Sequence, residues 1–265
     1  MDIRNTVRVI SVKQENPAHT TIELALKTDA VPGQFFMLTD YESGEKPFSV
    51  SRITDESVHF TIKKTGPFSK RLCKLEPGQT ITVRGPYGNG FDTGSLYGKR
   101  VLMIGGGCGT APLRSLLEAA GTIASVDFVN GARSADELLF PGGLIDAANQ
   151  YDCTDDGSAG EKGTVLDICA LHLRYTDYDS IAVSGPEPML QAVINSLDGL
   201  NVPSFFLIER YMKCAIGICG QCSLDPDGVR VCVEGPVFER SRLAALTEFG
   251  SYKRDAAGLR RPFGV

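Results

Sequence analysis

Residues 100–113 read RVLMIGGGCGTAPL, and this stretch decides the fold. Its first part, 100–104, is the apolar run expected of a strand buried on both faces of a parallel sheet. Glycines follow, and residues 113–120 then show helical spacing of apolar side chains. Pro112 suits the first turn of such a helix, where its missing N–H is not needed. The stretch therefore predicts a strand, a glycine loop and a helix in succession, which is the repeating unit of an α/β sheet.

The same alternation continues towards the C-terminus. Apolar runs at 125–129 and 180–183 predict further parallel strands, and the pattern over 189–197 predicts another helix. We therefore expect a doubly wound parallel sheet over residues 98–203.

The glycine loop is a candidate phosphate site, because glycine allows close approach and a helix N-terminus presents N–H groups. The strict G-x-G-x-x-G fingerprint fits poorly, since Thr110 stands where its last glycine would be. A tight turn without a ligand therefore stays open as an alternative. A second loop after an apolar run begins at Gly185, and ligands bind such sheets beyond the carboxyl ends of the strands. The candidate residues are Gly105, Gly106, Gly107, Gly109, Thr110, Gly185 and Pro186.

Residues 1–97 have a different pattern. Short strand-like runs at 7–12, 20–26, 60–62 and 80–83 are separated by turn residues, which predicts a small antiparallel barrel. The segments 46–49 and 85–91 stand out, but their composition alone indicates loops.

Four cysteines near the C-terminus carry the most specific chemical signal. They have the C-x4-C-x2-C…C spacing of a plant-type [2Fe–2S] cluster, and they are Cys214, Cys219, Cys222 and Cys232. A structural zinc site is the first alternative, although zinc usually takes two C-x2-C-type knuckles. Disulfides are the second alternative. The other cysteines show no ligand spacing and are expected to be small apolar residues; they are Cys73, Cys108, Cys153 and Cys169.

These cysteines lie in a predicted small module at 204–240. A strand-like run at 205–208 leads into it, a turn is expected at 225–228 and a returning strand at 229–233. Residues 241–265 are predicted to form a charged tail, with a surface helix followed by a loose end.

The composition excludes some classes of function. The chain has 265 residues and a net charge of −5, with no cluster of Lys and Arg, which argues against nucleic acid as a partner. No apolar run approaches the roughly 20 residues needed to cross a bilayer, so no membrane segment is expected. A cytoplasmic location follows by default, and a thiolate-bound cluster suits a reducing compartment.

Residues 1–203 together resemble the ferredoxin–NADP reductase superfamily. The whole chain resembles the electron-transfer subunits of class 1B dihydroorotate dehydrogenases, most specifically over 209–222 and 231–238. The resemblance implies FAD bound by the barrel, NAD(H) bound by the α/β domain at its glycine loops, and a [2Fe–2S] cluster in the C-terminal module. It implies no catalytic acid or base in this chain.

The resemblance also assigns the flavin-binding residues. The family's first flavin motif falls on Lys46, Pro47, Phe48 and Ser49, with Ser49 nearest flavin N5. Its second falls on Thr61, Ile62 and Lys63, and its phosphate contact falls on Phe68 and Ser69. The chain departs from the family pattern at Lys46, Ile62, Lys63 and Phe68. Lysine keeps the positive charge of the family's arginine but loses its planar bidentate fork.

The implied function is electron transfer in pyrimidine biosynthesis. Hydride would pass between the nicotinamide and the flavin, and single electrons would pass through the cluster to an FMN-containing catalytic subunit that interconverts dihydroorotate and orotate. Two copies of each subunit form the family's heterotetramer, and net flow runs from dihydroorotate to NAD. Three alternatives remain: an NAD(P)H reductase subunit serving a hydrogenase or ferredoxin, a non-enzymatic cluster-based redox sensor, and a zinc-stabilised binding module.

Overall fold

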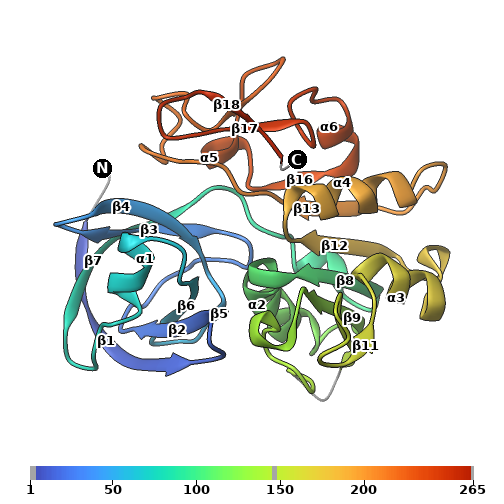
Figure 1. Cartoon of the computed structure of the whole chain (residues 1–265), viewed down its shortest axis with the longest axis horizontal. Coiled ribbons are helices and arrows are strands. Elements are labelled where there is room, and N and C mark those ends of the chain that lie inside the picture. The colour runs from blue at the N-terminus through green and yellow to red at the C-terminus, as the bar shows by residue number, and fades with distance from the viewer. Residues whose placement is uncertain (1–3, 145–147, 264–265) are drawn as a thin grey trace.

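The computed structural model describes residues 4–144 and 148–263, so the outermost residues of the first predicted domain and of the predicted tail lie outside it. Figure 1 shows a barrel beside an α/β domain, with the C-terminal segment lying across both. Within the described ranges, no helix is long and apolar enough to cross a membrane.

The N-terminal part is an antiparallel barrel. Its strands are β1 (Asn5–Gln14), β2 (His19–Leu24), β3 (Phe35–Asp40), β4 (Gly44–Ser49), β5 (Arg52–Ile53), β6 (Val58–Lys63) and β7 (Thr80–Tyr87). They pair in the order β4-β3-β7-β1-β2-β6-β5. The outermost strands of that order, β4 and β5, are separated in the chain only by Val50 and Ser51, so the sheet curls back on itself. Helix α1 (Pro67–Leu72) follows β6.

Strand β4 corrects a prediction. Residues 46–49 were expected to be a loop, but they pair with β3, where Phe36 lies opposite Phe48 and Leu38 opposite Lys46. The composition of this segment does not indicate a strand because it contains Pro47, a residue that sheets tolerate at an edge. Residues 85–87, also expected in a loop, form the end of β7.

The α/β domain has a seven-stranded sheet. Its parallel strands are β8 (Arg100–Gly106), β9 (Ser125–Ala132), β10 (Ala148–Thr154), β11 (Glu161–Lys162), β12 (Ser180–Ser184) and β13 (Ser204–Leu207). The order is β11-β10-β9-β8-β12-β13-β16, in which only β16 (Val237–Glu239) runs antiparallel. The helices are α2 (Thr110–Ala120), α3 (Val165–His172) and α4 (Glu187–Ser196), with short 3-10 turns at 94–96, 107–109, 135–137 and 175–177. The predicted doubly wound sheet is confirmed.

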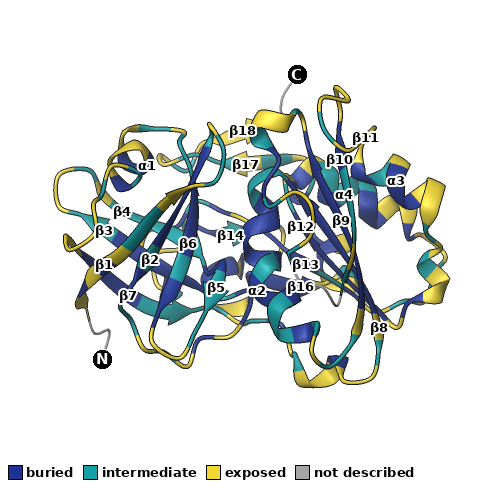
Figure 2. Ribbon diagram, turned by 90° about the horizontal axis from the view of Figure 1, so that it is seen from below, coloured by how far each residue is buried: buried dark blue, intermediate teal, exposed yellow. Residues whose placement is uncertain are grey.

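Alternate residues of β8 face opposite sides of this sheet. Val101 and Met103 pack in the apolar cluster that contains α2, whereas Leu102 and Ile104 pack in the cluster that contains α3 and α4. Both faces are therefore covered, which explains the uninterrupted apolar run in the sequence. Figure 2 shows α2 between the barrel and the sheet, where Ser115 Oγ donates to the Val50 carbonyl at 3.3 Å.

The C-terminal segment contains β14 (Ser223–Leu224), β15 (Val229–Arg230), α5 (Val231–Glu234), β16, α6 (Arg240–Ala244), β17 (Tyr252–Arg254) and β18 (Arg260–Pro262). Strand β13 was predicted to open this module, but it pairs in parallel with β12 and so belongs to the second sheet. The returning strand ends at Arg230, and residues 231–234 form a helical turn. The predicted loose tail is instead a hairpin of β17 and β18.

Candidate cofactor and cluster site

The two glycine loops meet at the carboxyl ends of adjacent strands. Ser184 of β12 lies opposite Gly105 of β8. A Cβ on Gly109 would lie 2.4 Å from the backbone nitrogen of Gly185, so the loops touch through their main chains. A Cβ on Gly107 would meet nothing within 4 Å, so this backbone borders open space beside the start of α2. The structure thus brings the predicted residues together in an arrangement that suits an approaching phosphate.

Thr110 plays a different part from its glycine neighbours. Its hydroxyl donates to Asn130 Oδ1 at 2.9 Å and is buried. Asn130 in turn donates to the Leu139 carbonyl and to Asp152, at 2.8 and 2.7 Å. The Thr110 side chain therefore fixes the first glycine loop through a buried hydrogen bond. The sequence analysis missed Asn130, although a polar residue directly after a buried run was a usable signal.

Lys46 and Phe48 lie on β4, the strand through which the barrel contacts the segment before the cysteines. Lys46 Nζ donates to the Tyr211 hydroxyl at 2.8 Å and lies 4.5 Å from the centre of its ring. Phe48 stacks on Phe68 with ring centres 6.0 Å apart. Ser49 ends the strand half-buried. Lys46, Pro47, Phe48 and Ser49, here called the β4 strip, are all half-buried, and Phe48 packs against the barrel core.

The second predicted flavin motif divides between the two faces of β6. Ile62 is fully buried in the apolar core of the barrel, so any contact of this residue with a cofactor would be through its main chain, and the predicted contact stays a prediction. Thr61 is on the opposite face of β6 and is also buried, and its hydroxyl is hydrogen-bonded to Ser51 at 3.0 Å and Thr21 at 2.9 Å. Lys63 reaches the α/β domain, where its Nζ lies 3.1 Å from Glu137.

Ser69 has a structural role that limits its use as a phosphate ligand. Its hydroxyl accepts from the backbone nitrogens of Thr65 and Gly66, at 2.9 and 3.0 Å, and donates to the Gly66 carbonyl. These bonds hold the first turn of α1. Phe68 is buried against the barrel core, and the phosphate contact predicted at Phe68 and Ser69 stays a prediction.

The four cysteines form two pairs. The Cys219 backbone nitrogen donates to Cys214 Sγ at 3.4 Å, and the Cys232 backbone nitrogen donates to Cys222 Sγ at 3.5 Å. Positive φ angles of 77° and 68° at Gly217 and Gly220 allow the loop to wrap. Among residues 4–144 and 148–263, no three Cys, His, Asp or Glu side chains are gathered as one metal ion requires, and no cysteine is in a disulfide. Hydrogen bonds thus link Cys214 with Cys219 and Cys222 with Cys232.

The pKa values of these thiols depend on their neighbours. Burial raises the pKa of Cys214, but backbone N–H groups of Cys219, Ile216 and Ile218 outweigh it and lower the pKa to about 7. The Cys232 thiol, by hydrogen bonding, lowers the pKa of Cys222 to about 6, while the pKa of Cys232 rises through the same contact and burial. The hydrogen bond thus favours the thiolate form of Cys222, and thiolates are the form that binds iron.

Cys108 marks the point where the three parts converge. Burial raises the pKa of its thiol to about 12, with Glu209 raising it further and Lys63 lowering it. Glu209 lies two residues beyond the end of β13, and the protein packed around it raises the pKa of its carboxyl. The sequence analysis treated Cys108 as an ordinary apolar residue and did not single out Glu209.

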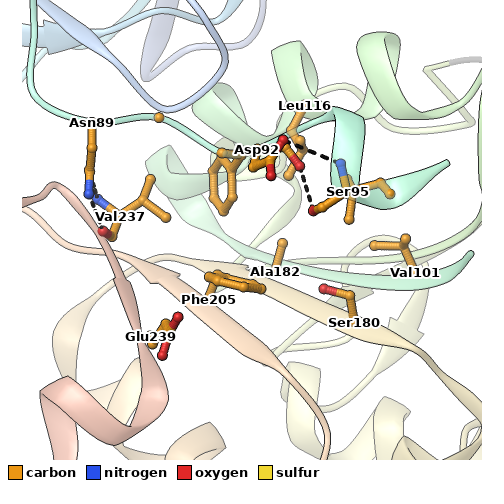
Figure 3. Close-up of a pocket in the computed structure, with 13 residues that line it drawn as sticks. Asn89, Asp92, Ser95, Val101, Leu116, Ser180, Ala182, Phe205, Val237 and Glu239 are labelled. Carbon is orange, nitrogen blue, oxygen red and sulfur yellow. Dashed lines mark hydrogen bonds between the residues drawn. The ribbon is translucent and has the colours of Figure 1, made fainter.

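A cavity of about 200 Å³ lies elsewhere, between the segment after β7 and the second sheet. Figure 3 shows Phe205, Ala182 and Leu116 lining it, with Asp92 and Glu239 nearby. None of the predicted cofactor residues lines this cavity, so it is separate from the site described above.

Comparisons with known proteins agree with this geometry. A family model described as the iron-sulfur cluster binding domain of dihydroorotate dehydrogenase B matches residues 209–244. The chain is 43% identical to a probable dihydroorotate dehydrogenase B (NAD(+)), electron transfer subunit, from Methanothermobacter thermautotrophicus, over 99% of this chain and 100% of that protein. A protein of the same description from Methanocaldococcus jannaschii is 38% identical over 95% of both chains.

Solved structures show the same fold. A structure of the NADH-dependent reduced ferredoxin-NADP oxidoreductase is similar with a TM-score of 0.79 and 26% identity, over 89% of this chain and 88% of that one. A ferredoxin NADP+ reductase from Neisseria gonorrhoeae, with bound FAD and NADP, has a TM-score of 0.58 and 22% identity, over 73% and 90% of the two chains. The second likeness concerns the fold alone. The predicted combination of barrel, parallel sheet and cluster-binding segment is confirmed.

Proposed function

The chain belongs to the family of dihydroorotate dehydrogenase B (NAD(+)) electron transfer subunits, and we propose that it passes electrons between NAD and a dihydroorotate-oxidising partner subunit. One observation carries this proposal: the β4 strip contacts the segment before the cysteines through Lys46 on Tyr211, and the 3-10 turn at 107–109 of the first glycine loop packs against β6 of the same barrel. An oxidoreductase that couples a two-electron donor to a one-electron carrier needs its cofactors adjacent.

A [2Fe–2S] cluster fits the donor set of the C-terminal loop. Cys214 with Cys219 would hold one side of it and Cys222 with Cys232 the other, as the two thiol pairs suggest. Such a cluster supplies single-electron chemistry when bound. The exposed Ile216 and Ile218 beside these cysteines offer an apolar surface to a partner.

FAD fits the outer face of the barrel through the β4 strip. Lys46 would offer positive charge and Ser49 a hydroxyl to which no residue of the described ranges is hydrogen-bonded, and Lys63 would add a second positive charge. The side chains of Thr61, Ile62 and Ser69 are committed to the protein's own packing and hydrogen bonds. Flavin supplies the exchange between hydride and single electrons when bound.

NAD(H) fits the paired glycine loops. Gly105, Gly106, Gly107 and Gly109 would leave room for the pyrophosphate at the start of α2, with Gly185 and Pro186 on the neighbouring strand end. The partner is proposed to be the FMN-containing catalytic subunit, joined in a heterotetramer of two plus two. The cytoplasmic location remains a prediction of the same proposal.

An anaerobic NADH titration of the purified protein, followed by visible absorbance, tests this function. We expect the flavin band and then the cluster bands to bleach. Cluster absorbance without flavin would contradict the reductase assignment, and zinc without iron would favour a binding module. Co-expression with a dihydroorotate dehydrogenase catalytic subunit should then give a complex that reduces NAD with dihydroorotate, whereas this chain alone should not.

A second candidate is a reductase subunit that serves a ferredoxin. The likeness to the NADH-dependent reduced ferredoxin-NADP oxidoreductase favours this candidate. The identity of that protein to this chain is 26%, which is lower than the 43% identity of the dihydroorotate dehydrogenase B relative. The protein that co-purifies with the native chain distinguishes the two candidates.

A further inference from the structure

Arg84 joins the flavin barrel to the cluster loop. It lies on β7, and only 5% of its surface is exposed. Its Nη1 donates to the carbonyl oxygen of Cys214 at 2.8 Å, and its Nη2 donates to that of Lys213 at 3.3 Å. A barrel residue thus holds the main chain of the first cluster ligand.

The other side of the same guanidinium is fixed within the barrel. Its Nε and Nη2 donate to the two carboxylate oxygens of Glu45 at 2.8 and 2.6 Å, and its Nη1 donates to the Tyr87 hydroxyl at 3.0 Å. Glu45 precedes Lys46 on β4, the strand proposed to contact the flavin. The planar guanidinium has five N–H groups, so it can donate to the barrel residues and to the two backbone carbonyls at the same time, which an ammonium group cannot.

Stability alone does not account for this arrangement. A buried ion pair contributes little compared with apolar side chains of the same volume, because both charges lose their water. Here the guanidinium of the pair also donates hydrogen bonds to backbone carbonyls about 130 residues away in sequence. Lys46 on Tyr211 forms a second link between the same strand and the same loop.

We propose that Arg84, held by Glu45, is a positioning residue that sets the placement of the cluster loop against the flavin strand and keeps a positive charge beside the cluster. This inference rests on the proposed function. The guanidinium controls how fast electrons pass between flavin and cluster, and it raises the reduction potential of the cluster, because potentials of such centres follow local charge and hydrogen bonding.

The test uses the full-length protein with both cofactors and compares Arg84→Lys and Arg84→Gln with the wild type. Arg8→Gln is the matched control, since Arg8 is exposed on β1 of the same barrel. In stopped-flow experiments with NADH, the rate at the flavin band should stay within about twofold in every variant, because Arg84 does not reach the glycine loops. The rate at the cluster bands should fall about tenfold in both Arg84 variants and stay unchanged in the control.

The cluster potential gives a readout that needs no NADH. In a dithionite titration followed by electron paramagnetic resonance, Arg84→Gln should shift the cluster midpoint to more negative potential than Arg84→Lys, which keeps the charge. If both variants match the wild type in cluster rate and potential, the proposal is wrong. Loss of the cluster with the flavin still bound would support it, whereas joint loss of flavin and cluster in both variants would show a barrel-stability role instead. If NADH does not reduce the wild type, that result counts against the proposed function. The dithionite titration still tests the role of Arg84, because it compares the cluster potentials of the variants and the wild type without NADH.

Discussion

At the scale of single residues, His19 is buried in an unusual way. Its side chain is fully buried at the start of β2, and its Nδ1 lies 2.9 Å from Asn16 Oδ1, an oxygen that can only accept a hydrogen bond. Its Nε2 has no hydrogen-bond partner within the part of the chain that the structure describes. Burial, with a further contribution from Lys63, lowers the pKa of His19 from 6.5 to about 4, so the folded protein holds a neutral imidazole.

His19 should therefore make folding stability depend on pH. The unfolded chain takes up the proton near pH 6.5 and the folded chain only near pH 4, so its contribution is complete above pH 6.5 and is lost progressively as the pH falls to 4. The loss should reach about 3 kcal/mol near pH 4 and about 2 kcal/mol at pH 5. Urea unfolding followed by circular dichroism, at about pH 7.5 and about pH 5, measures it. His19→Gln should show a smaller pH effect than the wild type, with the exposed His172→Gln as control; equal pH effects in all three would refute this account.

The residue scale also shows what motif spacing can and cannot predict. The cysteine spacing predicted thiols that the structure gathers into pairs, since ligands of one cluster must lie close in space. The second flavin motif placed Ile62 at a ligand, but a strand alternates its faces, and Phe60 and Ile62 both enter the core. The alternation of apolar and polar residues over 60–63 contained that information. Nothing local, by contrast, indicated that Arg84 meets Cys214, because that contact depends on how the modules pack.

At the scale of elements, the packing of the two glycine loops depends on Gly109. A Cβ there would lie 2.4 Å from Gly185 nitrogen and 2.6 Å from the Ser184 carbonyl carbon, which are backbone atoms that cannot rotate away. Gly109→Ala should push the loops apart. We expect NADH to bind about tenfold more weakly and the folded state to lose about 1–3 kcal/mol.

Titration of the flavin band with NADH, together with urea unfolding, checks both effects of Gly109→Ala. Gly94→Ala is the control, because its Cβ would meet only Asp92 Oδ1 at 3.4 Å. Unchanged NADH affinity in Gly109→Ala would mean that the nucleotide does not depend on this contact between loops.

Elements were predictable where they carry a local pattern. The apolar runs of β8, β9 and β12 are buried on both faces, and the helices between them have regular spacing. Strand β4 and the β17–β18 hairpin lack such patterns and are stabilised by partners distant in sequence. Asp225, for example, accepts from the Tyr252 hydroxyl at 2.7 Å and from Arg254 at 2.6 Å, and so ties the hairpin to the cysteine module.

At the scale of the whole molecule, one buried ionic network links the α/β domain to the C-terminal segment. Arg210, which follows β13, forms a bidentate pair with Glu187 of α4, and its Nε lies 3.8 Å from Glu248. The Gly250 nitrogen donates to Glu187 at 2.7 Å, and the Asp225 nitrogen donates to Glu248 at 3.1 Å. Arg254 Nη2 also lies 3.5 Å from Glu248, so the segment that crosses above both domains in Figure 1 is anchored by a network with Arg210 at its centre.

Removing that guanidinium should loosen the C-terminal segment as a unit. Arg210→Leu would leave the buried Glu187 without its cation and would leave the buried Glu248 with Arg254 alone, whose Nη2 lies 3.5 Å away. Breaking one side of a buried pair costs about 3–5 kcal/mol, because the remaining charge stays out of water. Unfolding experiments should show this loss, and limited proteolysis should cut first within residues 240–263. Arg242→Leu, which removes an exposed pair with Asp227, should change stability by less than about 1 kcal/mol. A loss as small in Arg210→Leu as in Arg242→Leu would mean that apolar packing, and not this network, attaches the cluster-bearing segment to the α/β domain.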